Sequence, residues 1–118
     1  MSENNQLRVN YEELDVQDDY RYKYNDKLFT GIAFEENDVG QLLAEVSYVD
    51  GVKNGISRTY YPSGQLRVEK YLCRGGVEGL CQCWYENGQL EAERIYDEHH
   101  ALTKERIWNE NGKLIKDW

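Results

Sequence analysis

Three cysteines and a pair of histidines are the residues whose types most readily suggest chemistry. Cys73, Cys81 and Cys83 follow a C-x7-C-x-C pattern, and His99 and His100 are adjacent. Zinc sites usually pair two cysteines, and then two histidines, with a few residues between the partners. This spacing does not fit that pattern. We therefore expect no metal site, and we interpret the cysteines as small residues packed within a sheet.

Two other groups have residue types that take part in catalysis or base stacking. Residues 97–100, DEHH, contain a possible acid–base pair, but a solvent-exposed loop is the favoured interpretation. Tyr20, Tyr22 and Tyr24 alternate with polar residues; they lack the basic surroundings of a single-strand binder, so strand packing is favoured. There is no nucleophile elbow and no phosphate-binding glycine loop. The sequence predicts a protein that is not an enzyme and has no cofactor.

Charge favours a basic partner. The 118 residues contain 14 Lys+Arg and 22 Asp+Glu, a formal net charge of −8. Nucleic acids and anionic membranes are recognised by clustered Lys and Arg, so we expect neither as a partner. Five acids lie close together near the N-terminus: Glu12, Glu13, Asp15, Asp18 and Asp19. Two interpretations stay open, a solvated loop and an acidic arm that contacts a basic protein surface.

Length and composition indicate one folded domain. Aromatic residues make up 13% of the chain, whereas disordered acidic chains contain few. We find no apolar segment of signal-peptide or membrane-span character. Three cysteines are too few for a disulfide scaffold and fit reduced thiols. We therefore expect a soluble, cytoplasmic protein.

The elements that position these residues follow a 24-residue repeat. Repeat units are predicted at 31–54, 55–78, 79–102 and 103–118, after an acidic segment and capping strand at 1–30 that we expect to cover the first sheet edge. The units align glycines, leucines and acids in columns: Gly40, Gly64, Gly88 and Gly112; Leu42, Leu66, Leu90 and Leu114; Glu45, Glu69, Glu93 and Asp117. The four units are expected to form a single domain.

Each unit predicts a β-hairpin with a three-residue turn that ends in glycine, which supplies a residue of positive φ. A tight turn would pair the residues on either side of it: Tyr60 with Leu66, Trp84 with Leu90, and Trp108 with Leu114. The sequence therefore predicts an all-β protein, an elongated and curled antiparallel sheet of about eight strands.

Strict alternation divides the predicted sheet into two faces. Even-numbered positions are apolar, interrupted by Arg58, Lys70, Gln82 and Arg94, and form the expected core. Odd-numbered positions form a polar face, and the candidate partner-binding residues lie there: Tyr61, Tyr85, Glu45, Glu69, Glu91 and Glu93. Tyrosine is enriched at interfaces. For the acidic column, cross-strand pairing with Arg and Thr inside the sheet is the alternative.

The pattern G-x5-Y/W-Y-x-x-G-Q-L-x-x-E resembles the MORN repeat variant of bacterial proteins. Three places make the whole chain similar to the YwqK family of antitoxins. These are YNDKLFTGIAF before the repeats, the units SRTYYPSGQLRVE and CWYENGQLEAE, and the closing ERIWNENGKL. The resemblance covers about residues 8–118. It implies a non-catalytic protein that binds and neutralises a cognate toxin, often the C-terminal domain of a secreted polymorphic toxin.

The resulting hypothesis is an antitoxin or immunity protein that blocks its toxin by direct stoichiometric binding. A cationic toxin, such as a nuclease or a nucleic-acid deaminase, would suit the charge. The alternative is a MORN-type scaffold that recruits another protein or a membrane.

Overall fold

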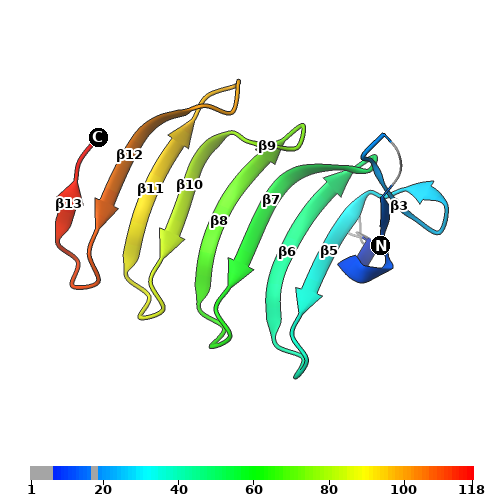
Figure 1. Ribbon diagram of the computed structural model, residues 1–118, viewed down its shortest axis with the longest axis horizontal. Helices are drawn as coiled ribbons and strands as arrows, with labels where there is room; N and C mark the ends of the chain where they lie inside the picture. The colour runs from blue at the N-terminus through cyan, green and yellow to red at the C-terminus, as the bar shows by residue number, and fades with distance from the viewer. Residues whose placement is uncertain (1–6, 17–18) are drawn as a thin grey trace, which may run out of the picture.

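The computed structural model describes residues 7–16 and 19–118, and it is nearly all β. Its main sheet has ten strands in the order β1-β5-β6-β7-β8-β10-β11-β12-β13, with β9 paired to β8 (Figure 1). The strands are β1 (Leu7–Asn10), β5 (Gly31–Glu36), β6 (Leu42–Val49), β7 (Val52–Tyr60), β8 (Leu66–Cys73), β9 (Gly76–Val77), β10 (Gly79–Trp84), β11 (Leu90–Tyr96), β12 (Leu102–Trp108) and β13 (Leu114–Lys116).

The molecule is elongated, as expected. Its radius of gyration is 16.1 Å and its extents are 49 × 37 × 34 Å, whereas a compact domain of this length would have a radius of about 13–14 Å. The radius is large because the hairpins follow one another in a single curved row, as Figure 1 shows. The all-β prediction is therefore confirmed. No helix in the part of the chain that the structure describes is long and apolar enough to span a membrane.

The predicted turn pairs are present in the units 55–78, 79–102 and 103–118. Tyr60 pairs with Leu66, Trp84 with Leu90, and Trp108 with Leu114. The turn glycines have positive φ, for example +93° at Gly64. In that turn the N–H of Tyr61 donates to the carbonyl oxygen of Gln65, and the N–H of Gly64 donates to the carbonyl oxygen of Tyr61. This is the geometry of a three-residue loop whose last residue is left-handed.

A β-bulge follows each turn and corrects the predicted division of the faces. Trp84 pairs with Leu90, but the next pair is Cys83 with Ala92, so Glu91 is the extra residue in its strand. The same shift separates Tyr60 from Thr59 in the preceding unit. An extra residue reverses the alternation beyond it. The acids at 45, 69 and 93 therefore lie on the same face as the residues at 60, 84 and 108, and not with the tyrosines at 61 and 85.

We name the two faces by residues that register places on them. The tryptophan face carries Trp84 and Trp108. The cysteine face carries Cys81, Cys83 and Ala92, and most buried residues of the main sheet belong to it: Val9, Ala33, Tyr48, Ser57, Leu72, Cys81 and Ala92. Along most of the sheet that the structure describes, no second layer of strands or helices covers either face.

The N-terminal segment forms a cap that differs from the predicted one. The capping strand predicted within residues 1–30, where Tyr20, Tyr22 and Tyr24 alternate, is not at the sheet edge. Instead, β1 occupies that place and pairs with β5 in parallel. Residues of the expected strand form a hairpin, β3 (Tyr22–Tyr24) and β4 (Lys27–Leu28), which joins β2 (Asp15–Val16) in a separate small sheet. The hairpin turns at Asn25 and Asp26, which both have positive φ.

This cap completes the main hydrophobic cluster, in which Phe29 is only 1% exposed. Phe29 contacts the ring of Tyr48, with ring centroids 5.5 Å apart, and Tyr48 contacts Tyr22 edge to face. Val9 and Ala33 belong to the same cluster. A short 3-10 turn, η1 (Tyr11–Glu13), lies beside β5. The best-packed part of the protein is thus the N-terminal end.

Candidate functional site

Tyr61 and Tyr85 connect neighbouring hairpins. The hydroxyl of Tyr61 donates to the carbonyl oxygen of Trp84 at 2.7 Å, and that of Tyr85 donates to the carbonyl oxygen of Trp108 at 2.8 Å. Burial, with the nearby Glu91 carboxylate, raises the pKa of Tyr61. Both rings are half-buried. These tyrosines therefore have a structural role between repeats, and their contact with a partner stays a prediction.

The acidic column lies on the opposite face and is joined to arginines. Glu45 Oε2 lies 2.9 Å from Arg8 Nη2, and the Tyr60 hydroxyl donates to Glu45 Oε1 at 3.0 Å. Partial burial raises the pKa of Glu45, but these hydrogen bonds outweigh it and hold the pKa below its ordinary value. Glu69 pairs with Arg58 at 2.7 Å. The arrangement favours cross-strand pairing, the alternative considered above.

Glu93 is the third member of the column. It accepts a hydrogen bond from Gln82 and lies 3.8 Å from Arg106. Arg106 in turn donates to Asp117 at 2.9 Å. The prediction that Glu45, Glu69 and Glu93 share a face with Tyr61 and Tyr85 is therefore wrong, because the bulge reverses the alternation between them.

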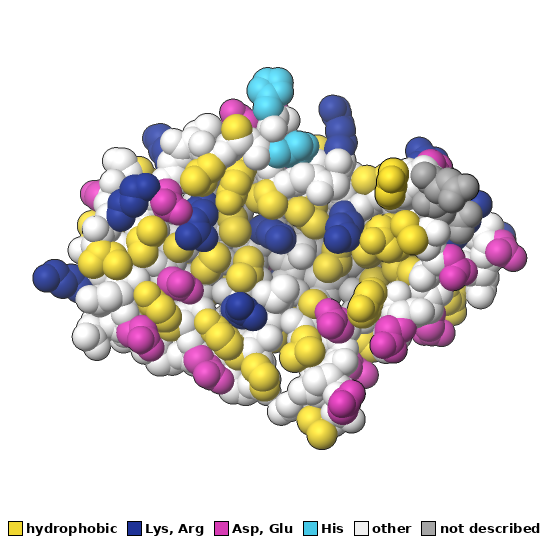
Figure 2. Space-filling view, in the orientation of Figure 1, with side chains coloured by type: hydrophobic (Ala, Val, Ile, Leu, Met, Phe, Trp, Pro, Cys, Tyr) yellow, Lys and Arg dark blue, Asp and Glu magenta, His cyan; other side chains and the backbone are white. Residues whose placement is uncertain are grey.

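The acidic N-terminal segment is accessible. Four of its five acids are exposed, on η1, β2 and the following loop: Glu12, Glu13, Asp15 and Asp19. Asp18 lies outside the described residues. Figure 2 shows acidic side chains gathered on the same side of the molecule as the N-terminal cap. This segment lies on η1, β2 and the loop after them, whereas the glutamates of the column lie on β6, β8 and β11.

A row of cations crosses the cysteine face and was not predicted as a site. Register places Lys70 beside Ser57, and Arg94 beside Cys81 and Glu105. Glu105 is paired with both Arg94 and Lys116, at 2.6 and 2.9 Å. Figure 2 shows Lys and Arg side chains between hydrophobic ones across the middle of the face it presents. The one sequence signal was the interruption of the apolar pattern at positions 70 and 94.

The two thiols of β10 have different chemical properties. Cys81 is buried and Cys83 is half-buried, and Arg94 Nη1 lies 3.6 Å from the Cys83 sulfur. The hydrogen bond from Cys81 and the Arg94 charge lower the pKa of Cys83 to about 7. The same hydrogen bond and burial raise the pKa of Cys81.

The expected loop at 97–100 is confirmed. The N–H of His100 donates to the carbonyl oxygen of Asp97, and its ring Nδ1 lies 3.1 Å from the carbonyl oxygen of Val77. His100 has φ +66°, and it follows His99, which lies 24 residues after the connector glycine Gly75. Over residues 7–16 and 19–118, no cluster of three or more His, Cys, Asp or Glu side chains is arranged to hold a metal ion.

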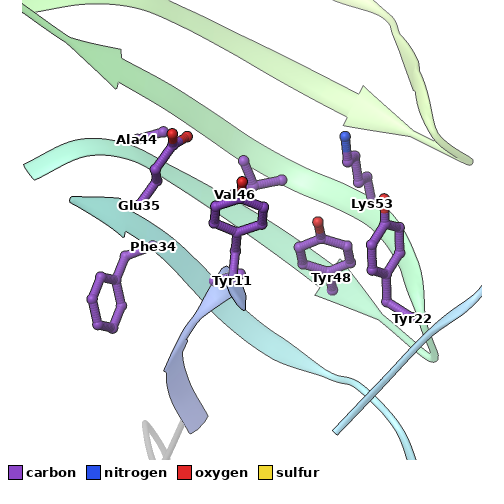
Figure 3. Close-up of a pocket in the computed structure, with 9 residues that line it drawn as sticks. Tyr11, Tyr22, Phe34, Glu35, Ala44, Val46, Tyr48 and Lys53 are labelled. Carbon is purple, nitrogen blue, oxygen red and sulfur yellow. The ribbon is translucent and has the colours of Figure 1, made fainter. Parts of the chain in front are cut away.

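A cavity of about 220 Å³ lies on the cysteine face at the N-terminal end. Its lining comes from η1, β3, β5, β6 and β7: Tyr11, Tyr22, Ala33, Phe34, Glu35, Ala44, Val46, Tyr48 and Lys53. Figure 3 shows Glu35 and Lys53 at opposite ends, with Val46 and the hydroxyls of Tyr11 and Tyr48 between them, while the Phe34 ring points away. No spacing in the sequence pointed to this group, because a five-element assembly brings it together.

Comparison with known proteins identifies the repeat. Residues 53–72 and 77–98 match the MORN repeat variant. The first segment covers most of β7 and of β8, and the second covers β10 and β11. No curated protein and no solved structure matches the chain. The middle of the chain is therefore similar to MORN repeats, which supports a repeat scaffold.

Proposed function

We propose that this protein is an antitoxin that binds a cognate toxin domain and blocks it stoichiometrically. The observation that carries the proposal is the open repeat sheet, a single layer whose two faces remain half-exposed over three hairpins. The resemblance of the entry segment and closing unit to YwqK antitoxins supplies the kind of partner. Contact with a protein partner would cover surface that this fold leaves accessible.

The exposed apolar side chains support a protein partner. Large exposed hydrophobic groups occur on several strands, including Ile56, Tyr71, Leu80 and Ile115. Contiguous exposed apolar surface is typical of interaction sites in soluble proteins. Repeats that stack side by side commonly use such extended surfaces for binding.

The charge distribution favours a basic contact at the N-terminal end. Glu12, Glu13, Asp15 and Asp19 are exposed, and Glu35, Glu36 and Asp38 are exposed on β5 and its turn. The acidic column is already paired with arginines, so it contributes less free charge. A cationic toxin domain would therefore meet the cap first, and long-range attraction would speed its association.

Co-expression with the toxin domain encoded beside this gene tests the proposal. Cells that express the toxin domain should grow again when this protein is co-expressed, and an equimolar complex of the two proteins should be isolated. Reversing the charge of Glu12, Glu13 and Asp15 to lysine should slow association at least tenfold at low salt, and less at high salt. The matched control reverses Glu110, an exposed acid at the last turn, and should leave association within twofold. Failure to bind that toxin would reject the antitoxin proposal.

A further inference from the structure

We propose that the cavity beneath η1 binds a basic amino acid, either free or as the C-terminal residue of a peptide. The inference uses the cavity and its charges alone and does not rest on toxin neutralisation.

The two ends of the cavity carry opposite charges. Glu35 on β5 pairs in register with Ala44, and Lys53 on β7 pairs with Tyr48. Ala44 and Tyr48 lie four positions apart on β6, a separation of about 13 Å at ~3.3 Å per residue. Neither Glu35 nor Lys53 forms an ion pair with a charged side chain in the described part of the chain. Each charge is therefore available to a ligand.

Tyrosine hydroxyls reinforce the lysine end. Tyr48 is 95% buried, being 5% exposed, and its hydroxyl makes no hydrogen bond to the residues that the structure describes. Figure 3 shows this hydroxyl directed toward the space between Glu35 and Lys53. Burial raises the pKa of Tyr48 to about 12, so it remains a hydrogen-bond donor at neutral pH. No buried side-chain polar atom of the described residues lacks a hydrogen-bond partner, so this hydroxyl reaches solvent from the cavity, and a ligand oxygen would take the place of water there.

The floor between the charged ends is apolar, formed by Ala33, Ala44 and Val46. An aliphatic stem fits that floor, and a volume of about 220 Å³ corresponds to roughly seven water molecules, the size of one large amino acid. A carboxylate would meet Lys53 and Tyr48, and a terminal ammonium or guanidinium group would meet Glu35. Arginine and lysine have this arrangement.

Charge decides between ligand classes. A simple anion would be repelled by Glu35, and a simple cation by Lys53. A neutral zwitterion would satisfy both ends, but a basic amino acid has a net positive charge and is favoured by a protein of net charge −8. The nearby exposed acids of η1, Glu12 and Glu13, add to this preference.

Titration calorimetry with L-arginine tests the proposal, with amide chemical-shift mapping of the same protein. Arginine should bind and should shift the amides of residues 31–36 and 44–53. Agmatine lacks the carboxylate and norleucine lacks the terminal cation, so each should bind at least tenfold more weakly. Glu35→Gln and Lys53→Met should each weaken arginine binding at least tenfold.

Glu36→Gln is the matched control. It removes the same charge from the next residue of β5, which pairs with Leu42 rather than Ala44. Its arginine affinity should stay within twofold of the parent. Equal losses in Glu35→Gln and Glu36→Gln would overturn the site, as would unchanged affinity in Lys53→Met, agmatine binding as strong as arginine, or no arginine binding. Circular dichroism of each variant verifies that the sheet is retained.

Binding of tripeptides distinguishes a free amino acid from the C-terminal residue of a peptide. Gly-Gly-Arg with a free carboxylate is compared with its C-terminal amide and with free arginine. Tighter binding of the free-acid tripeptide than of arginine would identify a chain terminus as the ligand, whereas tighter binding of arginine would identify the free amino acid. Equal binding of the acid and amide tripeptides would overturn the carboxylate contact with Lys53.

Discussion

At the scale of single residues, the turn glycines show how conformation rather than packing selects a residue. A Cβ built on Gly64 would meet nothing within 4 Å, yet its φ is +93°. Positive φ costs an L-residue free energy, and most of all a β-branched one. The requirement at Gly64 is therefore purely conformational. At Gly31, in contrast, a Cβ would come within 3.1 Å of the Phe29 ring and closer still to the Leu7 backbone.

Gly64→Val should lower the free energy of unfolding by about 1–3 kcal/mol because the turn needs positive φ. Gly64→Asn should cost less, since asparagine adopts this conformation more readily. Chemical denaturation of the three proteins measures both effects. Equal stabilities for Gly64→Val and the parent would contradict the turn conformation.

Cys83 should be the thiol that reacts first. The hydrogen bond from Cys81 and the charge of Arg94 lower its pKa below the ordinary thiol value, so its thiolate forms at lower pH. Alkylation by iodoacetamide, followed by peptide mass spectrometry, should show a lower midpoint pH for Cys83 than for an ordinary thiol, while buried Cys81 stays protected. Arg94→Gln should move the midpoint upward. Identical pH profiles for the two thiols would argue against this arrangement.

At the scale of elements, the hairpin was predictable and the bulge was not. Glycine and leucine columns predicted the turns and the Trp84–Leu90 pair, because turn chemistry and cross-strand packing leave local signals. The sequence alternates without interruption through Glu91, so nothing in it indicated the extra residue. The sequence therefore placed Glu93 in the correct strand but on the wrong face of the sheet.

The cap and the cavity were less predictable, for a different reason. Leu7–Asn10 pairs in parallel with β5 across 24 positions of sequence, and no local pattern encodes a partner at that distance. Tyr22 and Tyr24 did predict a strand, but the turn at Asn25 and Asp26 divides that segment into a hairpin. Lys53 and Glu35 belong to no sequence motif. Only the folded chain places them at opposite ends of the cavity.

Tyr85→Phe should weaken the junction between the last two hairpins. The substitution removes one hydrogen bond to the Trp108 carbonyl and keeps the ring, so we expect a loss of about 1 kcal/mol. Hydrogen exchange should increase selectively in β12 and β13. Tyr71→Phe is the control, because Tyr71 is an exposed tyrosine of β8. An unchanged exchange rate in β12 would contradict the connecting role of Tyr85.

At the scale of the whole molecule, stability should fall from the N-terminal end to the C-terminal end. The cap packs Phe29, Tyr48 and Val9 into one cluster, whereas every residue of β13 is exposed. In a repeat array each unit is stabilised mainly by its neighbours, and an end unit has only one.

Native-state hydrogen exchange should therefore be slowest in β5 and β6 and fastest in β12 and β13, with β8 to β11 between them. Two-dimensional NMR in deuterium oxide measures these rates strand by strand. A uniform rate over the whole sheet would mean that the protein unfolds as one cooperative unit instead.

The recurring bulge has a consequence for how such a chain can grow. Register shifts occur at the same place in the hairpins, between Glu35 and Glu36, Thr59 and Tyr60, Cys83 and Trp84, and Ile107 and Trp108. The alternation of side chains therefore reverses at the same position in every unit. As a result, equivalent residues at the start of each unit lie on the same face of the sheet. Duplication or loss of a whole 24-residue block would leave every other residue on its present face, either the tryptophan face or the cysteine face. The length of the exposed surface can therefore change by gene duplication or deletion without changes in the remaining hairpins.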